Sequence, residues 1–316
     1  MKPQPGGSVL LTSLLVVAIA SILASVIVWK SYSSIIKVEA QQDVAQARWI
    51  LKGAIDYARW ILIADSNGLE GQSVQIDHLQ EPWAQEIPFS KLDKLFTSKL
   101  SQADQNFFML TGLSGRIKDE QSKFNLARIT DTKNPINTEQ GLKILFKELL
   151  IKDSFHHKFL SLLKEEHKIL SNKYILNSKS FNSPKQRRKS LRKIIRLLKL
   201  TPEKEKLLSS KVTWLSKPTP ININTAPIEV IAATLNESNK EKLTNLIEAV
   251  QKFPLRSLNE VASFYDYKFI PKNLIDVKSD FFTVTGYANF GKAELGFDAL
   301  LRRNGFQAWI TDLQII

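Results

Sequence analysis

Residues 1–29 read MKPQPGGSVLLTSLLVVAIASILASVIVW, and this stretch decides how the rest of the chain is interpreted. The segment Ser8–Trp29 has 22 residues and no charged one. As a helix it would be about 33 Å long, enough to cross the apolar core of a bilayer. A secretory signal has a shorter apolar core, of about 7–15 residues, that ends at a small-residue cleavage site. Small residues occur at 18–20 and 24–26, but the apolar run continues past both. The pattern therefore favours a permanent anchor over a cleaved signal.

Apolar residues continue beyond the anchor at helical spacing. The stripe consists of Ile36, Ala40, Val44, Ala47, Leu51, Ile55, Ala58 and Leu62. Steps of three and four residues place these side chains on one face of a helix. The segment has no proline, so a single helix is predicted from Ser8 to about Ala64, with Asn67-Gly68 as its stop signal.

The composition indicates a folded chain with an uneven charge. Hydrophobic residues make up 43 % of it, and six Trp can help to fill a core. There is no cysteine, which excludes disulfides, thiolate metal sites and thiol nucleophiles. The formal net charge is +13. Residues 179–217 hold thirteen Lys or Arg and only two Glu, so this segment supplies most of the excess.

The basic segment contains a predicted amphipathic helix. Its candidate basic patch consists of Arg187, Arg188, Arg192 and Arg196. Two interpretations stay open: a binding surface for nucleic acid, lipid head groups or an acidic protein, and a solvated helix face without a partner.

Strand-like segments lie before residue 130 and after residue 280, and a helical region lies between them. The simplest fold class is α+β, with an all-α domain inserted into an antiparallel-sheet domain that follows the long N-terminal helix.

The chain lacks recognisable catalytic motifs. His157 and His167 are ten residues apart, which does not fit the four-residue spacing of a helical zinc site. No glycine-rich phosphate loop and no nucleophile elbow occurs in the sequence. We therefore predict a protein that is not an enzyme and holds no metal.

Residues 219–231, TPININTAPIEVI, resemble the opening of helix-hairpin-helix modules, some of which bind DNA. The motif residues are Asn222, Asn224, Thr225 and Ala226, and Thr225 is expected to cap the next helix. DNA-binding modules use a glycine hairpin that lets backbone N–H groups approach a phosphate. The corresponding segment, Leu235–Lys240, has no glycine, so the packing unit is expected without DNA binding.

The N-terminus resembles a type IV pilin-like leader, with a short basic segment, a glycine and then the apolar helix. The resemblance implies cleavage between Gly7 and Ser8 by a prepilin peptidase, and methylation of the new N-terminus. It also implies that the apolar helix packs against those of other subunits. The residues concerned are Leu10, Leu11, Thr12, Leu15 and Val16.

Thr12 stands where ordinary pilins have glutamate, at mature position five. In an ordinary subunit that carboxylate is thought to neutralise the terminal amine of the subunit above, so its absence fits a subunit with none above it. With the stretches 119–126, 213–226, 253–259 and 281–287, the chain resembles the general secretion pathway protein K family, minor pseudopilins of type II secretion.

This resemblance implies an order of five parts, and in the last three a helical domain interrupts the pseudopilin domain. The order is leader 1–7, transmembrane helix 8–29, first part of the pseudopilin domain 30–130, inserted helical domain 131–278 with a helix-hairpin-helix-like part 221–278, and C-terminal strands 279–316. It implies a single-pass inner-membrane protein with a periplasmic C-terminal domain.

The implied function is to initiate and cap the pseudopilus at its tip, for export of folded proteins. The implied partners are other minor pseudopilins and the prepilin peptidase, with an exported protein or the secretin as further candidates. Two rival functions stay open: a membrane-anchored nucleic-acid-binding protein, and a periplasmic hydrolase.

No cofactor is predicted from the residues themselves. Calcium is implied by the family resemblance alone. The available carboxylates are Asp119, Glu120, Asp280 and Glu294, which the sequence does not assemble into a site.

Overall fold

The computed structural model describes residues 6–66, 75–91, 111–129, 135–172, 183–265, 273–305 and 307–316. The chain forms two compact units. The first unit comprises residues 1–51, 91–113 and 288–295, and the second comprises 52–90, 114–287 and 296–316. A strand that the sequence predicts at Phe107–Leu110 lies outside the described residues.

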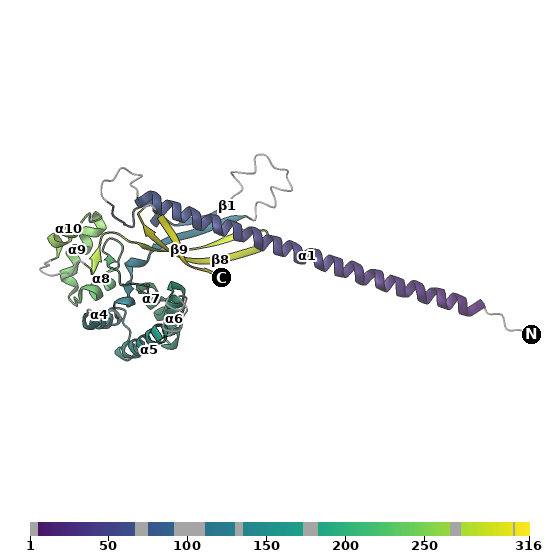
Figure 1. Cartoon of the computed structure of the whole chain (residues 1–316), viewed down its shortest axis with the longest axis horizontal. Coiled ribbons are helices and arrows are strands. Elements are labelled where there is room, and N and C mark those ends of the chain that lie inside the picture. Colours follow the sequence, from purple (N-terminus) through teal and green to yellow (C-terminus); the bar gives the residue numbers. More distant parts are fainter. Residues whose placement is uncertain are drawn as a thin grey trace, which may run out of the picture. The chain divides into compact units, whose positions relative to one another are not determined.

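One helix, α1, runs without a break over Gly6–Ser66, 61 residues (Figure 1). This confirms the single helix that the sequence predicts. The predicted stripe is buried from Ala47 to Leu62, whereas Ile36 and Ala40 are exposed. The buried part of the stripe therefore begins about two thirds of the way along the helix.

The first unit joins α1 to the turn of a β-hairpin. The Asp43 carboxylate accepts a 3.0 Å hydrogen bond from the backbone N–H of Lys292. The preceding residue, Gly291, has φ +55°, and a Cβ there would collide with the Asp43 carboxylate. Glycine is therefore required both by the backbone conformation and by the space beside Asp43.

A five-stranded sheet has the strand order β1-β2-β7-β8-β9. Its strands are β1 (Ile87–Lys91), β2 (Gly112–Asp119), β7 (Phe281–Phe290), β8 (Ala293–Asn304) and β9 (Gln307–Ile315). β8 and β9 pair antiparallel, with an irregularity between Leu300 and Leu301. The sheet thus combines strands from before and after the helical region, as the predicted insertion requires.

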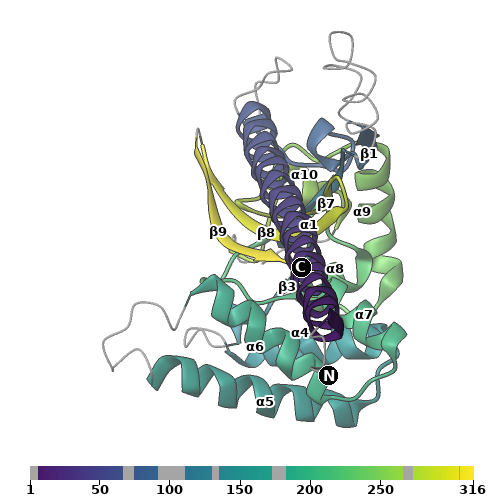
Figure 2. The same ribbon diagram turned by 90° about the vertical axis from the view of Figure 1, so that its right-hand side faces the viewer.

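Apart from α1, the α-helices of the described residues lie in the second unit. They are α4 (Pro135–Glu148), α5 (Asp153–Asn172), α6 (Pro184–Leu197), α7 (Pro202–Lys211), α8 (Ile228–Leu235), α9 (Lys240–Lys252) and α10 (Leu258–Phe264). Figure 2 shows α5 and α6 side by side, in agreement with their contacts. One core cluster includes Phe146, Phe159, Ile194 and Trp214. The helical region therefore has a substantial apolar core of its own.

Two pairs of short parallel strands bring together the ends of the helical segments. β3 (Phe124–Asn125) pairs with β4 (Val212–Thr213), and β5 (Ile221–Asn222) pairs with β6 (Ile275–Asp276). The second pair brackets α8, α9 and α10. It thereby brings the two ends of this segment together.

Candidate functional site

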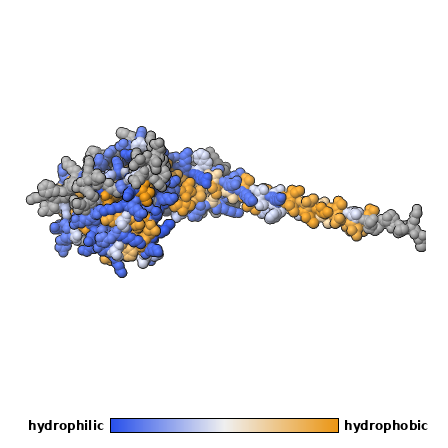
Figure 3. Space-filling view, turned by 60° about the horizontal axis from the view of Figure 1, so that its bottom comes forward, coloured by the Kyte–Doolittle hydropathy of each residue, from blue (hydrophilic) through white to orange (hydrophobic). Residues whose placement is uncertain are grey.

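The N-terminal part of α1 presents apolar side chains outward. The exposed set includes Leu10, Leu11, Leu15 and Val16, which are 56–69 % exposed. Figure 3 shows apolar residues along this part of the helix. Within the described residues, α1 is the one helix that is long and apolar enough to cross a membrane. A surface of this kind is stable in lipid or against other helices.

Thr12 lies on the same exposed part of α1. Its hydroxyl donates a 2.9 Å hydrogen bond to the Val9 carbonyl oxygen, one turn earlier. This bond lets the polar group stay in apolar surroundings at low cost. Gly7 and Ser8 belong to the first turn of α1, and residues 1–5 lie outside the described chain. Cleavage between Gly7 and Ser8 stays a prediction.

The motif around Asn222 is a buried structural joint. Asn222 is fully buried, and its Nδ2 donates to the Asp77 carbonyl, Asp119 Oδ2 and Ser279 Oγ at 3.0–3.1 Å. Its Oδ1 accepts a hydrogen bond from the Asn224 backbone N–H. The amide thus fixes several separate chain segments at once.

Asn224, Thr225 and Ala226 complete this joint. Both polar atoms of the Asn224 side chain bond the Leu255 backbone, at 3.0 and 2.9 Å. The Ala226 backbone N–H donates to the Asn222 carbonyl. Thr225 does not cap α8 as predicted; Pro227 is the capping residue. The Thr225 hydroxyl donates to Asp119 instead, because that buried carboxylate needs donors.

Asp119 is the centre of the joint. It is 3 % exposed and accepts hydrogen bonds from the Gln121 backbone and from Asn222, Thr225 and Ser279. Burial raises the pKa of Asp119 to about 6, against the lowering effect of these donors. A carboxylate with four internal donors has a structural role and little capacity left for another ligand.

Arg303 forms a second buried centre beside it. Its guanidinium pairs with Asp77 and, at 2.9 Å, with Asp65, and it donates to the carbonyls of Leu62 and Ser279. These contacts connect the end of α1 to β8. Neither Arg303 nor Asp77 was predicted from the sequence, because they are 226 residues apart and no local pattern links them.

Two arginines of the predicted basic patch, Arg187 and Arg188, are turned into the molecule instead of being exposed on its surface. The Arg187 guanidinium is buried, donates to the Leu215 carbonyl at 3.0 Å and lies 5.6 Å from the centre of the Trp214 ring. Arg187 follows the buried face of α6, which includes Leu191 and Ile194. Burial lowers its pKa from the ordinary arginine value.

Arg188 is bound to the sheet rather than presented to solvent. It pairs with Asp298 at 2.6 Å and with Asp312 at 3.0 Å, and its side chain is 13 % exposed. Arg192 also reaches this sheet edge, with Asp298 at 3.6 Å and Gln314 as partners. Of the four predicted arginines, Arg196 remains exposed without an ion pair in the described part of the chain.

The carboxylates considered for calcium do not fit that ion. The donors around Asp119 occupy its oxygens, and Glu120 pairs with Lys123 at 2.6 Å. Burial opposes the charge on Glu120, but Lys123 and hydroxyl donors lower its pKa to about 2. Asp280 instead lies 3.8 Å from Lys217, and Glu294 accepts a hydrogen bond from Asn289. A hard cation needs several free carboxylate oxygens, which this set does not offer.

Two other clusters bring three potential ligand atoms within 4.8 Å of one another. In the cluster of Asp65, Asp77 and Glu81, Arg303 already supplies the positive charge. The other consists of Asp153, His156 and His157 in the first turn of α5, with Lys143 3.9 Å from Asp153. A helix N-terminus and a neighbouring lysine both disfavour a cation. Neither cluster changes the prediction that the chain holds no metal.

The hairpin between α8 and α9 is closed by its own contacts. Asn236 adopts the left-handed conformation with φ 53°, and the N–H groups of Asn236 and Glu237 bond carbonyls of α8. The Asn239 N–H donates to the Glu237 carboxylate. These N–H groups are therefore unavailable to a phosphate, and Glu237 adds a negative charge.

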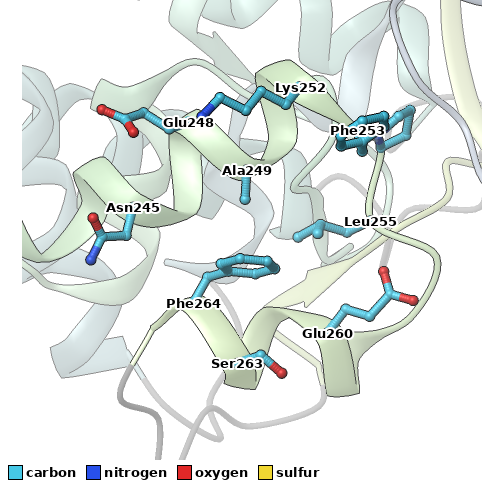
Figure 4. A pocket seen from close by; sticks show the side chains of 10 residues that line it. Asn245, Glu248, Ala249, Lys252, Phe253, Leu255, Glu260, Ser263 and Phe264 are labelled. Atoms are coloured by element: carbon cyan, nitrogen blue, oxygen red, sulfur yellow. The ribbon is translucent and has the colours of Figure 1, made fainter.

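A groove of about 670 Å³ lies between α9 and α10 (Figure 4). Its walls include Ala249, Phe253 and Phe264, and Phe253 is 77 % exposed. Glu248, Lys252 and Glu260 add charges of both signs. Nothing in these side chains resembles a catalytic set.

Comparisons with known proteins found a similar sequence and a similar structure. No model of a known protein family matches the chain. The chain is 25 % identical over 262 residues to "Type II secretion system protein K" of Pseudomonas aeruginosa, covering 79 % of this chain and 73 % of that protein.

The fold is similar to a chain in the crystal structure of the GspK-GspI-GspJ complex from the enterotoxigenic Escherichia coli type 2 secretion system. The TM-score is 0.59, the identity is 16 %, and the match covers 89 % of this chain and 99 % of that chain. The long apolar helix, the antiparallel sheet and the helices between its strands are shared features of this fold. By its sequence the chain is similar to protein K of the type II secretion system, and its fold is similar to that of a chain in the GspK-GspI-GspJ complex.

Proposed function

We propose that the chain is a minor pseudopilin that initiates and caps the type II secretion pseudopilus at its tip. The observation that carries the proposal is the combined likeness to protein K, which extends over most of the sequence and nearly all of the fold. The exposed apolar part of α1 supports it, because a helix of this kind packs in lipid and against other subunits.

Thr12 supports the position at the tip. A glutamate within the apolar part of the membrane costs free energy unless a positive charge neutralises it. A subunit with no neighbour above has no amine to neutralise, so a threonine bonded to its own helix is sufficient. The proposal therefore includes α1 packing through Leu10, Leu11, Thr12, Leu15 and Val16.

The proposed setting is the inner membrane, with the second unit in the periplasm. The proposed partners are other minor pseudopilins, in line with the complex in which the similar structure was solved. The prepilin peptidase is a further proposed partner. The role is structural and not catalytic. The nucleic-acid alternative loses its support, because the hairpin N–H groups are bonded internally.

The first test is the mature N-terminus, determined by mass spectrometry in cells with and without prepilin peptidase. We expect an N-methylated Ser8 that is present only with the peptidase. An intact Met1 in both strains would contradict processing, and a start beyond Ala20 would contradict the anchor.

The tip position needs a second test. The other minor pseudopilins should copurify with the chain from detergent-solubilised membranes. Thr12→Glu should weaken this copurification, because it adds an unneutralised carboxylate, which costs about 3 kcal/mol in a bilayer core. Thr12→Val should leave it intact. Equal behaviour of the two variants would argue against the tip position while leaving pseudopilin identity in place.

A further inference from the structure

Exposed cations follow one side of α6. Those without an ion pair among the described residues are Lys185, Lys189 and Arg196, with Lys199 just beyond the helix, and we call this row the α6 stripe. Arg192 is exposed on the same side but pairs with Asp298. From Lys185 to Lys199 the stripe is about 21 Å long at the rise of a helix. All four side chains are exposed.

The α6 stripe has no counter-ion within the described chain. None of its four residues forms an ion pair among the described residues, whereas Lys193 pairs with Glu166. The segment that leads into α6, residues 173–182, contains no Asp or Glu in its sequence. α6 itself has seven basic residues and no acidic one.

This arrangement costs stability. Lys185 and Lys189 are four residues apart, and like charges at that spacing destabilise a helix. Charge repulsion that the fold does not relieve is expected mainly at functional positions. The stripe therefore calls for a partner outside the chain.

Four cations of α6 have partners within the chain: Arg187, Arg188, Arg192 and Lys193. Arg187 and Arg188 are bound inside the molecule, and Arg192 reaches Asp298 and Gln314 at the sheet edge. The outward side is left mostly with lysines. Most of these partners are carboxylates: Asp298 and Asp312 bind the arginines, and Glu166 binds Lys193.

We propose that the α6 stripe binds an acidic segment of a partner protein. Charge complementarity over about 21 Å suits a row of Asp and Glu side chains, and it would speed association and set orientation. This surface lies outside the proposed assembly role of α1, so the two proposals succeed or fail separately.

Two other kinds of partner fit less well. α6 contains no aromatic side chain on which a nucleic-acid base could stack, and its arginines, the better phosphate ligands, are mostly engaged. Its apolar side, with Leu191, Ile194 and Ile195, is buried in the core and cannot enter a lipid surface.

The test uses the full chain in detergent and a fluorescein-labelled poly-L-glutamate of about 20 residues, whose length exceeds the stripe. Binding is measured by fluorescence anisotropy at low salt. The stripe variant is K185E/K189E/R196E. The matched control is K147E/K158E/K168E, which reverses three exposed helical lysines elsewhere and gives the same net charge. Circular dichroism melting confirms that both variants are folded.

We expect the stripe variant to bind poly-L-glutamate at least about tenfold more weakly, and the control variant to bind within about threefold of the parent chain. Absence of binding by the parent chain, or an equal loss in both variants, would overturn the proposal. Tighter, stripe-dependent binding to a DNA duplex or to phosphatidylglycerol vesicles would also overturn it, in favour of a nucleic-acid or membrane partner.

Discussion

The Thr225 hydroxyl donates a 2.6 Å hydrogen bond to the Asp119 carboxylate, across 106 residues of sequence. Asp119 ends β2, and Thr225 precedes α8. The same carboxylate oxygen also accepts from Asn222 and Ser279. One buried carboxylate thus connects the sheet to the start of the helix-hairpin-helix-like part, and it holds two parts of the fold in a fixed arrangement.

Asp119→Ala should lower the free energy of unfolding by about 3–5 kcal/mol. The substitution removes the acceptor and leaves several buried donors unsatisfied. The measurement is urea denaturation of the detergent-solubilised chain, followed by Trp fluorescence. Asp280→Ala is the control, because Asp280 is half-exposed and has only a 3.8 Å ion pair; its effect should stay within about 0.5 kcal/mol. Equal effects would show that the joint contributes little.

Arg188 and Lys189 are neighbours in the sequence with opposite roles. Arg188→Gln should cost about 3 kcal/mol of unfolding free energy, because it leaves the fully buried Asp312 carboxylate without its cation. Lys189→Gln should change it by less than about 0.5 kcal/mol, since that side chain is exposed. The same urea titration compares the two variants. A large loss in Lys189→Gln would mean that the outward side of α6 also stabilises the fold.

Stability should fall as the pH rises from about 5 to about 8. Burial raises the pKa of Glu81 to about 8 from an ordinary value of 4.5, with the nearby Asp65 and Asp77 adding to the rise. The folded chain therefore binds more protons than the unfolded chain in this window. The contribution of Glu81 is present below its unfolded pKa and is lost as the pH rises through about 8.

The variant Glu81→Gln isolates this contribution. It keeps an acceptor for the Trp83 indole N–H and does not titrate. Its melting temperature should depend less on pH than that of the parent chain, and the gap should be widest near pH 8. Burial lowers the pKa of His156 and His167, so their contribution to stability rises with pH. Both histidines are present in the parent chain and in the variant, so the difference between the two pH profiles reports on Glu81. Parallel pH profiles would disprove the assignment to Glu81.

Local sequence patterns predicted the elements well wherever periodicity was strong. The helix α1, the basic helix α6 and the C-terminal strands follow spacings of three to four or of two residues. The α+β fold with a helical insertion was predicted from strand-like segments on both sides of a helical region, and the observed sheet and helices confirm this fold class. The predicted boundaries at residues 130 and 278 stay predictions.

Side-chain roles were harder to predict, because they depend on partners far along the chain. A row of arginines gives the same sequence signal whether it faces water or a buried Asp312, and only the fold separates the two cases for Arg188. Thr225 has a typical capping sequence, yet the demand of the buried Asp119 carboxylate outweighs a cap bond. Arg303 and Asp77 gave no local signal at all.

Two glycines should respond in opposite directions to alanine. Gly53 lies inside α1, and a Cβ there would meet no atom within 4 Å, so Gly53→Ala should stabilise the chain by about 0.5–1 kcal/mol. Gly286 lies in β7, where a Cβ would collide with the Ser114 carbonyl oxygen and the Phe297 ring. Gly286→Ala should therefore cost about 2 kcal/mol, since strands β2 and β7 would have to separate. Thermal melting of both variants measures this. A loss of stability in Gly53→Ala would show that the open space beside Gly53 is occupied in the protein.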